Sequence, residues 1–506
     1  MSDPNLPPDQ FLYGRKGPWP QPSPTHPLIE ACEVLTIPPM ELMQWEATIG
    51  QRYLTTQIAY APAAAAEAVS TITKNYLGPD DQRFAQILFT TAYQRYLLPL
   101  TDADRSYLKS KGINDPAKEG ITSKYDFGAM HLVQPLTGLY CAPTRVYLAG
   151  SPPSQSVRYI SVGTDQVLVA PNDPAWMLAK AFALQGAAYQ MLFVVHPALH
   201  FPMDSINAVT KTAVPHTHPL FQLLFPHTTY SLALDNAVLE SAASVVNDNA
   251  QGTWFDPLTS DAYNLKLLFA AGYTGLDDSC YRGAYPASNY REPALICLPT
   301  TKPQPVHSTA YSTWQSAYFT RAFLPFCTSV AKFILGSDKT DSYVVHWARY
   351  LHHLVKGFPD ETEILDAECL GLTLAIYLWD VSLAHGADHA SFGSGLTAPE
   401  KFLRIRCAPP TSPKTPSPTS TTQIATGDDL ARAAMANEMF FVPWTMAPNL
   451  NDTAYAFTDP ALAILQVTFH TNLRDVDEDP KLTQFMPLRS SDPSGYAGTI
   501  PASIQY

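Results

Sequence analysis

The chain has 506 residues, of which 46% are hydrophobic and only 15% are charged, so it is able to bury a large core. Its 32 Lys and Arg residues against 45 Asp and Glu residues give a formal net charge of −13. Nucleic acid is excluded as a partner, because phosphate binding requires a basic surface and no basic cluster occurs.

The N-terminal residues lack a basic segment followed by an apolar one, so no secretory signal is expected. No apolar run reaches about 18 residues, so no membrane-spanning helix is expected either. The seven cysteines are odd in number and widely scattered. Reduced thiols of a cytoplasmic protein are the prediction from this pattern.

Residues 1–28 are rich in proline and are predicted to form an extended N-terminal arm. From residue 29 to about 100, apolar residues recur at spacings of three and four, which predicts two or three helices. Between Leu132 and Pro171 the pattern changes to alternating β-branched and aromatic residues bounded by Gly and Pro, which predicts a small sheet.

Long helical patterns follow at Trp176–His200, Ser231–Asn247, Ser308–Leu335, Ser342–Gly357 and Glu361–His389. The last is apolar on nearly every side, which is typical of the central helix of a large helical domain. Residues 408–429 are rich in Pro, Ser and Thr and are predicted to form a mobile surface loop. The fold class is therefore mainly α, with one large domain at 29–506 and a small β-sheet.

Two histidine pairs with H-x-x-x-H spacing end the two most apolar helices: His196 with His200, and His385 with His389. On a helix such pairs share one face, so two imidazoles are able to bind one metal ion, and two pairs offer a four-histidine site. Imidazole ligands suit iron, zinc, copper or manganese. The spacing alone does not distinguish this site from core histidines that are satisfied by hydrogen bonds.

Other candidates are weaker. Asp204 continues the first stripe, so a two-histidine, one-carboxylate site with His196 and His200 is an alternative. The segment HTHPLFQLLFPH is predicted to form a turn and a short buried helix, with structural or supporting roles for His216, His218 and His227. His346, His352 and His353 lie on a predicted amphipathic surface helix. Motifs of common hydrolases, dinucleotide-binding proteins, NTPases and zincins do not occur.

Several segments, in order, resemble the catalytic domain of the lipoxygenase family. PAWMLAKAFALQGAAYQMLFVVHPALH resembles the helix that ends in the first two metal histidines. HTHPLFQLLFPHTTYSLALDNAVL is similar to the family signature that follows it. CYRG at 280–283, IYLWDVSLAHGADHASFG and the chain end GTIPASIQY resemble further family landmarks. The resemblance covers roughly residues 160–506.

The resemblance implies a mononuclear non-haem iron, with manganese as an alternative. Its ligands would be His196, His200 and His385, with His389 as the variable fourth and the α-carboxylate of Tyr506 as the fifth. It also implies a dioxygenase in which a hydrogen atom is removed from a bis-allylic CH₂ of a polyunsaturated fatty acid and O₂ traps the radical, giving a hydroperoxide. Peripheral contact is the most that is expected with a membrane.

The chain also departs from the family pattern. The first histidine pair of the family is normally one residue further apart and is widened by a π-type turn. The family Arg after the signature is Leu239 here, and the Gln one turn before the first histidine is Leu192. The N-terminal β-barrel of plant and animal members is not expected here. Three alternatives stay open: a non-fatty-acid substrate, rearrangement of hydroperoxides, and a non-catalytic binder of apolar ligands.

Overall fold

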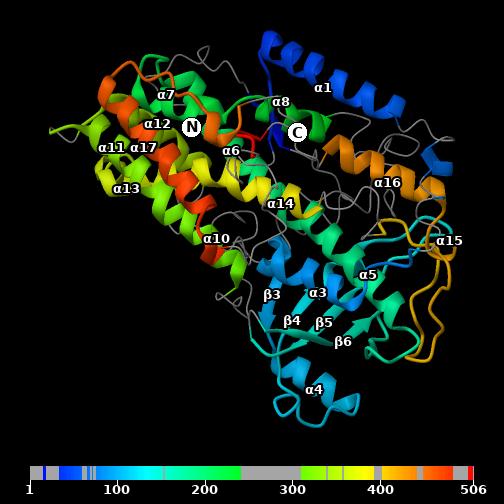
Figure 1. The fold of residues 1–506 in the computed structure, drawn as a ribbon. Coiled ribbons are helices and arrows are strands. Elements are labelled where there is room, and N and C mark those ends of the chain that lie inside the picture. Colours follow the sequence, from blue (N-terminus) through cyan, green and yellow to red (C-terminus); the bar gives the residue numbers. More distant parts are fainter. Residues whose placement is uncertain are drawn as a thin grey trace.

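The computed structural model describes residues 15–18, 33–59, 65–68, 71, 76–151, 154–240, 309–337, 340–355, 358–392, 402–440, 448–482 and 500–504. Figure 1 shows a body of helices at one end and a small sheet at the other, with helix α5 (Trp176–Tyr189) running from the middle of the molecule along the sheet. The predicted fold class, mainly α with a small sheet, is confirmed.

The sheet has five antiparallel strands in the order β3 (Leu97–Pro99), β4 (Ile121–Phe127), β5 (Thr144–Ala149), β6 (Ser156–Val162) and β7 (Val167–Val169). Helix α5 packs against β4, β5 and β6. Along β5, Val146 and Leu148 belong to the main core, whereas Tyr147 belongs to a smaller core with Leu108 of α4 (Asp102–Ser110). Both sides of this strand are therefore covered.

The predicted sheet region began too late in the chain. Strands β3 and β4 precede residue 132, and β3 lies inside the region that was predicted to be helical. The reason is physical: strand β4 has five buried residues among seven, so it lacks the regular alternation that marks a half-exposed strand.

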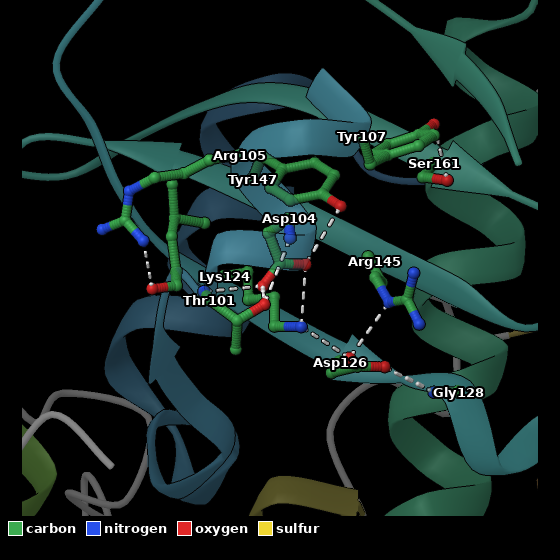
Figure 2. A network of polar contacts seen from close by, with 11 residues as sticks. Thr101, Asp104, Arg105, Tyr107, Lys124, Asp126, Gly128, Arg145, Tyr147 and Ser161 are labelled. Carbon is green, nitrogen blue, oxygen red and sulfur yellow. Dashed lines mark hydrogen bonds and ion pairs between the residues drawn. The ribbon is translucent and has the colours of Figure 1, made fainter. Parts of the chain in front are cut away.

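A network of charged groups fixes α4 on the sheet (Figure 2). The Lys124 Nζ atom lies 2.9 Å from Asp104 Oδ1 and 2.9 Å from Asp126 Oδ2, and Arg145 Nε lies 3.0 Å from Asp126. Burial alone would raise the pKa of Asp104, but hydrogen bonds from Thr101 and Lys124 hold it below its usual value. Each charged group of this network thus has a partner of opposite charge, which offsets the cost of removing it from water.

Helix α3 (Asp81–Thr90) lies beside the sheet, where the Tyr125 hydroxyl of β4 donates to Leu88 O (Figure 1). Most of the remaining helices form the larger body. Its N-terminal and middle helices are α1 (Pro39–Ala59), α6 (Pro197–Ala213), α7 (Pro219–Leu224) and α8 (Ser231–Glu240). Its later helices are α10 (Ala310–Tyr318), α11 (Leu324–Leu335), α12 (Ser342–Leu354), α13 (Ala367–Trp379), α14 (His385–Phe392), α15 (Thr421–Ile424), α16 (Gly427–Phe440) and α17 (Pro460–Asp477). Helix α13 packs along α11, which in turn packs on α17.

The segment Ala367–His389, which contains α13, is long and apolar enough to cross a membrane by length and composition. This departs from the expectation that no such segment exists. However, 78% of its most apolar window is buried inside the protein. The segment is therefore a central helix of the helical body, as the sequence predicted.

The structure describes parts of two segments that were predicted to be irregular. Within the predicted arm, Arg15–Pro18 forms strand β1, which pairs with β2 (Glu33–Leu35); the rest of the arm lies outside the described residues. The Pro/Ser/Thr segment, residues 408–429, has mostly exposed or half-buried residues and includes α15 and the first residues of α16. Its Pro413 carbonyl accepts from Ala175 N at 3.2 Å, Ser417 N donates to Pro174 O, and Ser417 Oγ accepts from Leu178 N. The segment thus satisfies backbone groups at the start of α5.

Close contact between α11 and α13 gives the first prediction. A Cβ atom at Gly371 would lie 2.5 Å from Thr328 Cα, a backbone atom that cannot move aside. We expect Gly371→Ala to destabilise the protein by about 1–3 kcal/mol through overpacking. Thermal and urea unfolding would measure it.

The matched control is Gly50→Ala on the exposed face of α1, where nothing lies within 4 Å of the added Cβ. It is expected to gain about 0.5–1 kcal/mol, because alanine loses less backbone entropy than glycine in a helix. Equal stability of the two variants would contradict the close packing of α11 and α13.

Candidate metal centre

Each histidine pair follows directly on a π-helical turn. The turn Gln190–Val195 lies between α5 and His196, and the turn Asp380–Ala384 lies between α13 and His385. The backbone N–H of His196 donates to Met191 O, five residues earlier, at 2.8 Å. Pro197 provides a reason, because its ring would clash with the carbonyl of residue 193 in a regular α-helix, and a wider turn relieves that clash.

The four predicted histidines are brought together. His196, His200, His385 and His389 are all buried, and their candidate ligand nitrogens lie within 4.8 Å of one another. The Nε2 atoms of His196 and His200 are 2.9 Å apart, those of His200 and His385 are 3.1 Å apart, and those of His385 and His389 are 3.1 Å apart. Two separate helices therefore direct four imidazoles at one small volume.

Carboxylates set the tautomers of the first pair. His196 Nδ1 lies 3.2 Å from Asp388 Oδ2, and His200 Nδ1 lies 2.8 Å from Asp235 Oδ1. Because an ionised carboxylate only accepts hydrogen bonds, each Nδ1 carries the proton. Each Nε2 then presents a lone pair to the cluster, which is the form in which histidine binds metals.

The second pair is also held neutral. Burial, together with the neighbouring histidines, keeps the pKa values of His385 and His389 well below the usual value. Nitrogen lone pairs that face one another repel, and a cation between them removes that repulsion. The four imidazoles therefore fit a metal ion.

The spacing of the nitrogens also fits a shared ion. Two nitrogens that bind one ion at about 2.1 Å lie at most about 4.2 Å apart. The three spacings of 2.9, 3.1 and 3.1 Å are within that limit. Neighbouring imidazoles of the cluster would therefore be able to hold the same metal ion.

Asp204 is not part of the cluster, which corrects the alternative site with one carboxylate. It lies near Asp235, whose Oδ1 is 2.8 Å from His200 Nδ1, on the side of the His200 ring that faces away from the cluster. Burial and the neighbouring Asp235 raise the pKa of Asp204 well above its usual value. Asp235 is therefore the carboxylate that contacts His200, and Asp204 lies behind it.

The other predicted histidines lie apart from the described cluster. His218 accepts from Leu220 N at the start of α7 and pairs with Asp341 at 3.0 Å, whereas His216 is exposed. His227 is buried and contacts the C-terminal segment. The structural interpretation of His218 and His227 therefore agrees with their contacts. On α12, His346 and His352 are exposed, as predicted for a surface helix.

Sequence reasoning missed Asp235 and Asp388, the two carboxylates that support the histidines. Each had a signal: Asp388 lies between the histidines of the second pair, and Asp235 interrupts the apolar run of α8. Two further candidates, the CYRG segment at 280–283 and the terminal Tyr506, lie outside the described residues.

Comparisons with known proteins agree on one architecture, although no family model matches the chain. Mouse polyunsaturated fatty acid lipoxygenase ALOX12 is 22% identical over 347 residues, which cover 62% of this chain and 46% of the mouse protein. The chain thus spans less than half of the length of that relative.

Among solved structures, coral 8R-lipoxygenase superposes with a TM-score of 0.69 at 14% identity, covering 98% of this chain and 80% of the coral chain. The manganese lipoxygenase of the fungus Gaeumannomyces graminis gives a TM-score of 0.68 at 13% identity, covering 98% and 96%. The chain therefore has the lipoxygenase fold.

Proposed function

We propose that the protein is a non-haem metal dioxygenase of the lipoxygenase type, which inserts O₂ into a polyunsaturated fatty acid to give a hydroperoxide. The observation that carries the proposal is the convergence of four buried Nε2 atoms on one point. The name of the mouse relative, a polyunsaturated fatty acid lipoxygenase, supports the substrate class.

In this proposal His196, His200, His385 and His389 hold the metal, and the α-carboxylate of Tyr506 is a fifth ligand. Iron is the proposed metal, with manganese as the alternative. The bound metal would supply the one-electron chemistry that removal of a bis-allylic hydrogen requires.

The residues of the chain itself perform three tasks. Asp235 and Asp388 keep the protons of His200 and His196 on Nδ1, so that both Nε2 atoms stay available. The two π turns orient the helical pairs toward each other. Burial excludes water from the cluster, which protects radical chemistry from side reactions.

Metal content tests the first part of the proposal. Wild-type protein with its native C-terminus should contain about one iron or manganese ion per chain, as measured by elemental mass spectrometry. His200→Ala should lose the metal and melt at a lower temperature, because bound metal stabilises the folded state. The control is His346→Ala on the exposed face of α12, which should keep both the metal and the melting temperature. A wild-type protein that takes up neither metal on reconstitution would refute the site.

Oxygen consumption tests the reaction. Metal-loaded wild-type protein should consume O₂ and form conjugated dienes with linoleate or arachidonate, and His385→Ala should do neither. Metal retention without O₂ uptake over a panel of polyunsaturated fatty acids would overturn the proposed substrate while leaving the metal site intact.

The carboxyl pair behind His200 gives a graded prediction. Asp235→Asn should weaken metal binding about 10–100-fold, because a neutral amide holds the Nδ1 proton less well than a carboxylate does. Asp204→Asn should change it much less, since it is Asp235 that lies 2.8 Å from His200 Nδ1. Competition with a chelator would measure both affinities, and an equal loss in both variants would contradict the specific role of Asp235.

A further inference from the structure

The described end of the chain, residues 500–504, is buried and held by backbone contacts. Leu450 N donates to Ile500 O at 2.8 Å, and Ala502 N donates to Pro448 O at 3.0 Å. Ser503 Oγ donates to Thr229 O at 3.0 Å. The segment also passes close to the second histidine pair, because a Cβ added at Gly386 would lie 2.8 Å from Ile500 Cγ2.

His227 makes the shortest described contact to this segment. Its Nδ1 lies 2.6 Å from Ala502 O, and its Nε2 lies 2.9 Å from the Tyr455 hydroxyl. A carbonyl oxygen only accepts, so Nδ1 donates and Nε2 accepts from Tyr455. The ring is completely buried, and burial lowers its pKa to about 4, so the neutral tautomer persists at neutral pH.

The contacts of His227 join parts of the chain that are far apart in sequence. The ring links the turn Phe225–His227 to the C-terminal segment and to Tyr455, which packs among Phe326, Phe457 and Phe469. The backbone carbonyl of His227 accepts from the Tyr377 hydroxyl of α13, the helix that leads to His385. His227 thus connects residues 500–504 to α13, the helix that leads to the second histidine pair.

We propose that His227 is a positioning residue that, with Tyr455, holds residues 500–504 in place, the segment that directly precedes the last two residues of the sequence. The role of the terminal carboxylate at the metal rests on the proposed function, whereas this latch does not. Loss of the ring would leave Ala502 O and the Tyr455 hydroxyl without their partner in a buried site, which weakens the hold on the segment.

The test compares full-length variants. His227→Leu removes both contacts, His227→Gln keeps a donor and an acceptor, and Tyr455→Phe removes one hydroxyl. The matched control is His218→Leu. His218 contacts Asp341 and the start of α7, and none of its described contacts is to residues 500–504. A serine carboxypeptidase is applied below the melting temperature of every variant, and intact mass follows release of the C-terminal residues.

We expect release to be at least about tenfold faster in His227→Leu than in wild type, intermediate in Tyr455→Phe, and close to wild type in His227→Gln and His218→Leu. Wild-type rates in folded His227→Leu, or equal acceleration in His218→Leu, would overturn the latch. If His227→Leu does not fold, Tyr455→Phe decides: faster release supports the latch, and wild-type release overturns it.

A second measurement separates the latch from the proposed function. Digestion after removal of metal by a chelator reports on the latch alone. In metal-loaded protein, the electron paramagnetic resonance spectrum should change in His227→Leu and not in His218→Leu at equal metal content. Faster digestion with an unchanged spectrum would keep the latch and refute a carboxylate ligand that depends on it. Absence of metal in wild type would refute the proposed function and leave the digestion result standing.

Discussion

The structure depends on one unfavourable arrangement: four buried imidazoles whose Nε2 atoms lie close together. Without a cation this arrangement costs free energy, because each nitrogen acceptor is desolvated and faces another acceptor. The surrounding residues hold it in place. Asp235 and Asp388 face the outer nitrogens of the first pair, and the packed helices α6 and α13 keep water out. Such strain in a core is typical of a site built for a ligand.

Other features of the fold follow from holding these two helical pairs in place. Helix α5 is fixed by the sheet on one side and by the Pro/Ser/Thr segment at its first turn. At Gly186 a Cβ would meet Phe127 of β4 at 2.9 Å, so the helix lies unusually close to the sheet. Helix α13 is held as closely against α11 at Gly371. The sheet and the helical body therefore act together as supports for the two segments that carry histidines.

The sequence predicted the helices that carry the site, because long apolar segments with paired histidines leave few alternatives. It did not predict the π turns, since widening by one residue leaves no trace in periodicity. It missed β4 because a largely buried strand does not alternate, and β3 because three residues are too few to show a pattern. It placed residues 408–429 in a surface loop, but composition alone does not indicate the backbone hydrogen bonds that Pro413 and Ser417 make with the start of α5.

The π turn before His196 has a consequence for insertions and deletions. A π turn accommodates one residue more than the α-helical turn that it replaces, so the flanking helices keep their directions when that residue is gained or lost. In the family pattern the additional residue lies between the first two histidines, whereas here the widened turn ends just before His196. A one-residue shift in the sequence spacing of the ligands can thus be absorbed within a single turn, and the four imidazoles still converge.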